Sequence, residues 1–276
     1  MLVRIGHSAD PDDAFMFWGI ASGTVDTRGF EFEPVVQDIQ TLNEWAMDAR
    51  LEVTALSLAT YPLVQDRYVL LRHGASMGSG YGPIVVAPKR VQLQELRELE
   101  VAVPGENTTA FLVLKMVMGG QFKWRVVPFE RILDEVRQGR ADAGLVIHEG
   151  QITFQSAGLE KCFDLGEWWL LETGLPLPLG VNVARRDLGE DVLRDLSEVL
   201  LESIQAGLDH RSDAVAYARG YGRGLDAALT DRFVSMYVNE LTCDFGDEGR
   251  QAVQELLRRA EAIGAYEQPV RLEFVE

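Results

Sequence analysis

A histidine at the end of an apolar strand is the residue of this sequence best placed for acid–base chemistry. His148 directly follows the apolar run Ala143–Ile147 and precedes Glu149, which could orient its ring. An imidazole titrates near neutral pH and can accept a proton at little cost, which suits a general base. Many histidines at strand ends only satisfy a local hydrogen bond, so the residue pattern alone leaves both roles open. We expect His73 and His210 on the surface.

Hydroxyl groups stand at two expected helix starts. The segment Gly105–Thr109 follows a strand and opens a helix, so Thr108 and Thr109 lie at the positive end of a helix dipole, which suits a carboxylate ligand. Threonine is also a very common helix N-cap, and spacing alone favours that simpler role for Thr108. Ser57 has the same two possible roles, because it ends an apolar strand and could either cap the helix that continues through Pro62 or bind a ligand.

Three carboxylates lie close together near the N-terminus, in the run Asp10-Pro11-Asp12-Asp13. They stand at an expected helix start, where the helix dipole stabilises acidic side chains. A hard cation would need further oxygen ligands, and the sequence offers no candidates for them. We therefore expect a capping or solvated role for these carboxylates and no metal site.

The candidate residues follow strands in an alternating series of strands and helices, which predicts an α/β fold with mixed, mostly parallel sheets. In such sheets ligands bind beyond the carboxyl ends of the strands, where loops enter helices. The loops expected to converge on one cleft are residues 7–13, 57–61, 105–109 and 148–151. The expected strands are 2–5, 30–36, 53–57, 100–103, 124–127 and 143–147, and the expected helices begin near 14, 39, 93, 108, 130, 192, 214, 231 and 250.

Two segments that contain proline predict where the chain passes between two lobes. The run GPIVVAP is continuously apolar, and the run GLPLPLGVNV carries spaced prolines followed by apolar alternation. We expect hinge crossings near residues 84–88 and 176–183. The expected lobes, with a ligand cleft between them, are a larger, discontinuous first lobe of residues 1–87 and 181–276, and a second lobe of residues 88–180.

The composition is that of a globular enzyme. Of 276 residues, 47% are apolar and 25% are charged, and the formal net charge is −17. This negative field repels nucleic acid and anionic membranes, so we expect neither as a partner, although backbone N–H groups can still hold a small anionic substrate. The two cysteines lack metal-ligand spacing, and the first residues show no export signal. We expect a soluble, cytoplasmic monomer or homodimer.

Five blocks of sequence resemble the 1,4-dihydroxy-6-naphthoate synthase family of the futalosine pathway to menaquinone. The similarity covers nearly the whole chain, and it implies the two-lobed (type 2) fold of periplasmic binding proteins. The blocks are TLNEWAMDARLEVTALS at Thr41–Ser57, DRYVLLRHGASMGSGYGPIVVA at Asp66–Ala87, VAVPGENTTAFLVL at Val101–Leu114, ADAGLVIHEG at Ala141–Gly150 and DLGEWWLLETGLPLPLG at Asp164–Gly180.

The resemblance also implies an activity and a site. The activity is that of a carbon–carbon lyase, which converts cyclic dehypoxanthinyl futalosine to 1,4-dihydroxy-6-naphthoate without a metal or an organic cofactor. The histidine of the family's IHEG block is regarded as the proton acceptor, and His148 is its match. By the same comparison, the residues that contact substrate are Ala55, Leu56, Ser57, Thr108 and Thr109.

One loop departs from the family pattern. Where the family typically has Ser-Pro-Cys-Pro-Asn-Asp-Thr-Phe, residues 8–15 of this chain read Ser-Ala-Asp-Pro-Asp-Asp-Ala-Phe. Two neutral groups are replaced by carboxylates, and one threonine hydroxyl is lost. Added negative charge beside the ligand would weaken the binding of an anion or select a different one. The alternative functions are therefore a sister enzyme that acts on chorismate or a related acid, and a non-catalytic protein that binds small carboxylates.

Overall fold

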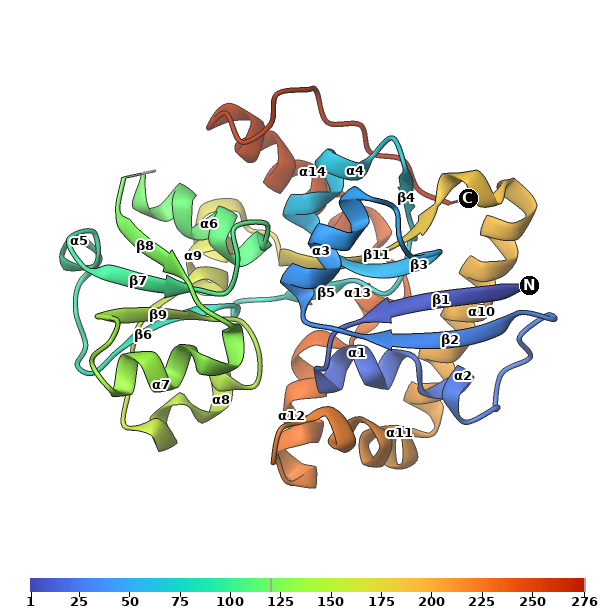
Figure 1. Ribbon diagram of the computed structural model, residues 1–276, viewed down its shortest axis with the longest axis horizontal. Helices are drawn as coiled ribbons and strands as arrows, with labels where there is room; N and C mark the ends of the chain where they lie inside the picture. The colour runs from blue at the N-terminus through green and yellow to red at the C-terminus, as the bar shows by residue number, and fades with distance from the viewer. Residues whose placement is uncertain (120, 276) are drawn as a thin grey trace.

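Two β-sheets lie side by side, each covered by its own helices (Figure 1). The computed structural model describes residues 1–119 and 121–275. We call the first sheet and its helices the first lobe, and the second sheet and its helices the second lobe. Both the N-terminal and the C-terminal segments belong to the first lobe, so its sequence is discontinuous.

The sheet of the first lobe has six strands, in the order β2-β1-β3-β11-β4, with β5 paired to β11. Strand β3 is buried along its whole length, although it contains the polar residues Thr54 and Ser57. The strands of this sheet are β1 (Leu2–His7), β2 (Glu31–Val36), β3 (Val53–Ser57), β4 (Tyr68–Leu70), β5 (Ser76–Gly78) and β11 (Leu177–Arg185).

The sheet of the second lobe has five strands, in the order β10-β6-β9-β7-β8. Its central strands, β6, β9 and β7, are almost entirely buried. The strands of this sheet are β6 (Ile84–Ala87), β7 (Glu100–Val103), β8 (Lys123–Val126), β9 (Ala143–Val146) and β10 (Glu160–Asp164).

Both sheets are mixed, as predicted. In both sheets the antiparallel pairs involve the strand with which the chain enters the sheet from the other lobe. Strands β1, β2 and β3 are paired in parallel, and so are β7, β8 and β9. Each antiparallel pair among the described residues contains either β6 or β11, the strands that the chain forms directly after it enters a lobe. The share of antiparallel pairing is therefore larger than we predicted, because the entering strands run against their neighbours.

The helices divide between the lobes in the same way as the strands. Those of the first lobe are α1 (Pro11–Met16), α2 (Trp18–Ala21), α3 (Ile39–Met47), α4 (Tyr61–Val64), α10 (Glu190–Asp209), α11 (Arg211–Ala218), α12 (Ala227–Tyr237), α13 (Glu240–Cys243) and α14 (Gly246–Ala262). Those of the second lobe are α5 (Leu93–Leu96), α6 (Thr109–Met118), α7 (Ile132–Arg137), α8 (Gly150–Thr153) and α9 (Leu165–Thr173). Short 3₁₀ turns are η1 (Leu58–Thr60), η2 (Phe129–Arg131), η3 (Phe154–Ala157), η4 (Arg186–Leu188) and η5 (Arg219–Tyr221).

The chain passes between the sheets slightly earlier than the proline-containing runs suggested. Residues 79–83 connect β5 to β6, and residues 174–176 connect α9 to β11. The apolar run that we interpreted as a crossing, near 84–88, is strand β6 inside the second sheet. Burial on both faces, and not passage between lobes, explains its apolar sequence. Movement of the two lobes as separate bodies stays a prediction.

A glycine holds the first connection close to α9. A Cβ atom on Gly166 would lie 2.0 Å from the carbonyl oxygen of Tyr81, a separation that real Cβ atoms do not show. Only glycine therefore lets the backbone of the connection approach the first turn of α9 so closely. Asp164 caps the same turn, because its carboxylate accepts hydrogen bonds from the Gly166 and Glu167 N–H groups.

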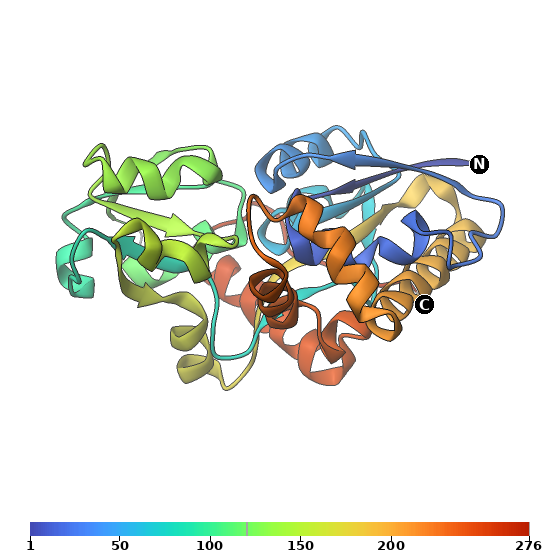
Figure 2. The ribbon, with the colours of Figure 1, turned by 90° about the horizontal axis from the view of Figure 1, so that it is seen from below.

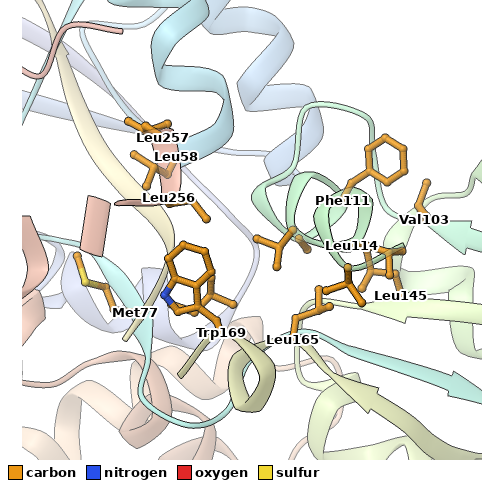
Figure 3. Close-up of a cluster of buried hydrophobic side chains, with 14 of the residues drawn as sticks. Leu58, Met77, Val103, Phe111, Leu114, Leu145, Leu165, Trp169, Leu256 and Leu257 are labelled. Carbon is orange, nitrogen blue, oxygen red and sulfur yellow. The ribbon is translucent and has the colours of Figure 1, made fainter. Parts of the chain in front are cut away.

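One apolar cluster continues from lobe to lobe (Figure 3). Leu58, Met77 and Leu256 contribute from the first lobe, and Phe111 and Trp169 contribute from the second. The two lobes therefore share buried apolar contacts.

Trp169 anchors the cluster. Its side chain is fully buried, and its indole N–H donates a hydrogen bond of 3.0 Å to the carbonyl oxygen of Pro176, in the return connection. A buried tryptophan needs such a partner for its one polar atom.

Replacing Trp169 tests how much this cluster stabilises the protein. W169A should lower the free energy of unfolding by about 3–5 kcal/mol, because it leaves a large cavity and an unpaired carbonyl. Urea unfolding followed by circular dichroism measures the change. Leu171 on the same helix is 87% exposed, so L171A should change the free energy of unfolding by less than about 0.5 kcal/mol. Equal losses in the two variants would contradict the assigned role of the cluster.

Candidate functional site

A cavity of about 100 Å³ lies between the lobes. The loop after β1, the end of β3 and part of β11 line it from the first lobe, and the start of α6 and Ile147, directly after β9, line it from the second. Pockets for organic ligands usually measure about 300–1,000 Å³, so this cavity holds a larger ligand only if the lobes or side chains move apart. Five residues predicted to contact substrate line the cavity: Ala55, Leu56, Ser57, Thr108 and Thr109.

The start of α6 presents backbone donors, because its hydroxyl groups are already used. Thr108 is the N-cap, and its hydroxyl oxygen accepts a hydrogen bond of 3.3 Å from the Phe111 N–H. The Thr109 hydroxyl donates to the carbonyl oxygen of Leu179 at 2.6 Å. Within the described chain, no partner accepts from the N–H groups of Thr109 and Ala110, and both residues line the cavity. An anion here would bind mainly to backbone N–H groups at the positive end of the helix.

Ser57 is oriented by an amide that the sequence analysis missed. The Ser57 hydroxyl oxygen accepts a hydrogen bond of 3.0 Å from Asn43, and the Ser57 N–H donates to the same amide at 2.9 Å. Ser57 makes no side-chain capping bond to the following turn, so the capping role is wrong. A signal was present in the sequence, because Asn43 is a polar residue on the buried face of α3, beside Leu42 and Ala46.

The loop that departs from the family pattern forms part of the cavity wall. Asp10, Asp12 and Asp13 all line the cavity, and the Ser76 hydroxyl donates a hydrogen bond to Asp12 at 3.3 Å. Burial, together with the charges of Asp13 and Asp10, raises the pKa of Asp12 well above its ordinary value. The raised pKa favours the protonated form of Asp12, which reduces the negative charge of the wall.

Neighbouring groups hold Asp13 and Asp10 differently. Asp13 accepts a hydrogen bond of 2.8 Å from the Ser8 N–H, and Asp10 accepts one of 2.9 Å from Arg223. The expected capping role of these carboxylates is wrong for Asp10, which stands at the N-cap position of α1 without a side-chain capping bond.

His148 lies at the contact between the lobes, beside the cavity and not in its wall. It is 5% exposed, and among the residues of this turn Ile147 lines the cavity. The Nε2 atom is 3.0 Å from the carbonyl oxygen of Phe129, and the Nδ1 atom accepts a hydrogen bond of 3.0 Å from the Gly150 N–H. This pattern fits the neutral tautomer that carries its proton on Nε2. Nδ1 is then the atom that can accept a proton once the Gly150 contact is released.

Charged groups around His148 set its titration. Burial lowers the pKa of His148, but the Glu149 carboxylate, 3.3 Å from Nδ1, together with Asp10 and the Phe129 carbonyl, raises it above its ordinary value. Burial raises the pKa of Glu149, but His148 and Arg223 lower it to about 2. Glu149 is therefore ionised at neutral pH although only 6% of it is exposed. Glu149 thus has Arg223 as its ionic partner, and His148 becomes a second one when the imidazole is protonated.

Arg223 is the second functional residue that the sequence analysis missed. Its guanidinium donates to both carboxylate oxygens of Glu149 at 2.9 Å and lies 4.4 Å from the centroid of the Phe129 ring. The sequence around it, Gly222-Arg223-Gly224, is typical of an exposed turn and gave no signal.

The four histidines have different surroundings. His73 is fully buried, so its expected surface position is wrong; its Nε2 atom is 2.9 Å from the Ser197 hydroxyl of α10. Burial lowers the pKa of His73 to about 4, so it is neutral at physiological pH. His210 is exposed, as predicted. His7 is buried against Phe17, and its Nδ1 atom is 2.8 Å from the carbonyl oxygen of Ser8.

None of the helices in the described parts of the chain combines the length and the apolar character that a membrane crossing requires.

Comparisons with known proteins agree with the resemblance found in the sequence. Residues 3–262 match a family model described as "Menaquinone biosynthesis". A 1,4-dihydroxy-6-naphthoate synthase of Thermus thermophilus is 45% identical over 262 residues, which cover 95% of this chain and 95% of the relative. A 1,4-dihydroxy-6-naphthoate synthase of Streptomyces coelicolor is 38% identical over 267 residues, 95% of this chain and 94% of the relative.

Solved structures confirm the predicted fold. A protein of Archaeoglobus fulgidus has a TM-score of 0.92 at 43% identity, over 96% of this chain and 98% of its own. The alkanesulfonate-binding protein of Xanthomonas axonopodis, solved with MOPS bound, has a TM-score of 0.73 at 11% identity, over 97% of this chain and 94% of its own. The α/β fold is therefore the two-lobed fold of periplasmic binding proteins.

The lowered pKa of Glu149 predicts a pH-dependent contribution to stability. An ionised, paired Glu149 stabilises the folded state at pH values above about 4.5, and this contribution is lost as the pH falls towards about 2. The difference in free energy of unfolding between wild type and E149Q should therefore shrink from pH 7 to pH 3, as measured by urea unfolding. The exposed Glu98 provides a matched control in E98Q. A difference that is constant with pH would contradict the ionised pair.

Proposed function

The chain belongs to the menaquinone biosynthesis family, and from this membership we propose that it converts cyclic dehypoxanthinyl futalosine to 1,4-dihydroxy-6-naphthoate. The proposal rests on one observation above all, the similarity to two naphthoate synthases along nearly the full length of both proteins. The reaction class is that of a carbon–carbon lyase. The small anionic substrate, the cytoplasmic location and the state of monomer or homodimer expected from the sequence stay predictions.

Three features of the cavity support a substrate that has a carboxylate and hydroxyl groups. The backbone N–H groups of Thr109 and Ala110 suit the carboxylate. Ser57 has its hydroxyl oxygen held by Asn43, so its own proton is available to a ligand hydroxyl. The raised pKa of Asp12 favours its protonated form, which can donate a hydrogen bond or accept one and repels an anion less than a carboxylate does. These groups would orient the aromatic and sugar-derived parts of the substrate.

In the proposed mechanism, His148 is the general base. Its Nδ1 atom takes the proton of a substrate hydroxyl, the C–O bond becomes a carbonyl, and the adjacent C–C bond breaks. The electron pair of that bond moves into the ring system, which becomes the aromatic naphthoate. Glu149, 3.3 Å from Nδ1, would stabilise the positive charge that the imidazole gains. The Gly150 contact with Nδ1 has to be released before this step.

Movement of the lobes would bring His148 to the substrate. The cavity is smaller than the usual volume of a ligand pocket, and the imidazole is held beside it by the Phe129 carbonyl and the Gly150 N–H. Entry of a substrate that parts the lobes would expose Nδ1, and closure around the substrate would exclude water from the reaction.

A sister enzyme that acts on chorismate or a related acid is the second candidate function. The observation that favours it is the position of Asp10 and Asp12 in the cavity wall, where the family has neutral residues. A non-catalytic carboxylate-binding protein is the third candidate, since the fold is shared with a sulfonate-binding protein.

Incubation with each substrate separates these functions. We expect cyclic dehypoxanthinyl futalosine to be consumed and the absorbance of 1,4-dihydroxy-6-naphthoate to appear, with no added metal or cofactor. Conversion of chorismate alone would support the sister enzyme. Calorimetric binding of the futalosine derivative without any product would contradict the lyase and support a binding protein.

Replacement of His148 tests the general base. H148N should lower kcat by about 10²–10⁴-fold, the usual loss when a positioned base is removed, while the affinity for the product stays close to that of wild type. The exposed His210 provides the matched control in H210N, which should keep wild-type kcat. A kcat for H148N within a few-fold of wild type would exclude His148 as the base.

A further inference from the structure

We propose that Arg223 is a positioning residue that couples contact between the lobes to the protonation of His148. The proposal rests on the function proposed above, because it takes His148 as the base. Arg223 belongs to the first lobe, whereas His148 and Glu149 belong to the second. Arg223 acts on His148 through residues of the second lobe, and its contacts with them require the lobes to meet.

The contacts of Arg223 cross the boundary between the lobes. One guanidinium nitrogen, Nη1, donates to Asp10 in the first lobe at 2.9 Å and to Glu149 in the second lobe, also at 2.9 Å. The same guanidinium lies over the ring of Phe129, whose carbonyl oxygen holds Nε2 of His148. Arg223 thus contacts Glu149 and the ring of Phe129, two residues that lie against the imidazole.

The segment that carries Arg223 extends from the helices of the first lobe. It connects η5 to α12 and lies against the second lobe (Figure 2). Arg223 has a φ of 36°, in the left-handed region that residues with a side chain rarely adopt. The flanking glycines allow the tight turn, and the ionic contacts of the guanidinium offset the strained backbone.

A second polar contact joins the first lobe to the segment that carries His148 and Glu149. The Tyr237 hydroxyl of α12 donates to Oε1 of Gln151 at 2.7 Å. The Nε2 atom of Gln151 is buried and has no partner in the described part of the chain, so this contact leaves one donor unsatisfied. An unpaired buried donor makes the contact less favourable. The ionic contact of Arg223 is therefore the stronger polar connection between the lobes at this turn.

The geometry fixes the sign of the electrostatic effect of Arg223 on the protonation of His148. The charged groups that face it are Glu149 on its own turn and Asp10 and Arg223 from the first lobe. Glu149 and Asp10 favour the imidazolium, whereas Arg223 opposes it by repulsion and by sharing the charge of Glu149. Arg223 is therefore the group of the first lobe that favours the neutral imidazole, and its contact with Glu149 exists only when the lobes meet.

Two substitutions should move the pKa of His148 in opposite directions. R223Q removes the opposing cation and should raise the pKa by about one unit; E149Q removes the favouring anion and should lower it by about one unit. The chain has four histidines, so their imidazole resonances can be titrated by NMR and assigned with H148N. The acid limb of the pH profile of kcat/KM should shift in the same directions.

Two further variants separate charge from a general structural effect. R258Q makes the same change at an exposed arginine of α14 and should leave the pKa of His148 unchanged. R223K keeps the positive charge and should bring the pKa back to within a few tenths of a unit of wild type, although it lacks the planar guanidinium.

Small-angle X-ray scattering of the ligand-free protein measures the contact between the lobes. R223Q should increase the radius of gyration, and R258Q should not. A wild-type radius for R223Q, or shifts of the His148 pKa in the same direction for R223Q and E149Q, would overturn the proposal. Both readouts are independent of turnover, so they decide the role of Arg223 even if H148N proves active and the proposed base is wrong.

Discussion

A carboxylate buried at the contact between the lobes constrains the whole site. Glu149 is almost completely removed from water, and an ionised carboxylate in such a place needs partners that replace its hydration. Its own turn supplies His148, and the opposite lobe supplies Arg223. Because one partner comes from each lobe, the group that touches the proposed base is fully paired only when the lobes are in contact.

Two further hydrogen bonds near the cavity also cross between the lobes. Thr109 of the second lobe donates to the Leu179 carbonyl of the first, and Thr60 of the first lobe donates to the Asn107 carbonyl of the second at 2.8 Å. These bonds and the Arg223 contact all cross between the lobes, so separation of the lobes would break them. The apolar cluster around Trp169 lies near the connecting segments and keeps the lobes together without polar bonds. A ligand that parts the polar contacts has to replace them with contacts of its own.

Local sequence signals predicted much of the fold. The strands at 53–57 and 100–103 were predicted with the bounds observed, because buried β-branched runs end at polar or glycine-containing turns. Strands β4 and β5 are three residues long, too short to show a period, and they were missed. The run at 84–87 was taken for a crossing because an apolar run bounded by prolines has the same pattern in a buried strand.

The site was predictable where it depends on strand ends and unpredictable where it depends on distant contacts. Ser57 ends a strand and Thr108 lies beyond the end of another, and both line the cavity as that rule requires. Arg223 contacts Glu149, which is 74 residues away in the sequence. No local sequence pattern predicts a contact over that separation. His73 was misplaced because its neighbours Arg72 and Gly74 suggest a surface loop, whereas α10 covers it.

A crystal structure with 1,4-dihydroxy-6-naphthoate bound tests the account most directly. We predict the ligand in the cavity between the lobes, with its carboxylate at the N–H groups of Thr109 and Ala110. We also predict Nδ1 of His148 turned from the Gly150 N–H towards the ligand, with Glu149 still paired to Arg223. A ligand bound outside this cavity, or an imidazole that keeps both of its present contacts while the ligand occupies the cavity, would contradict the account.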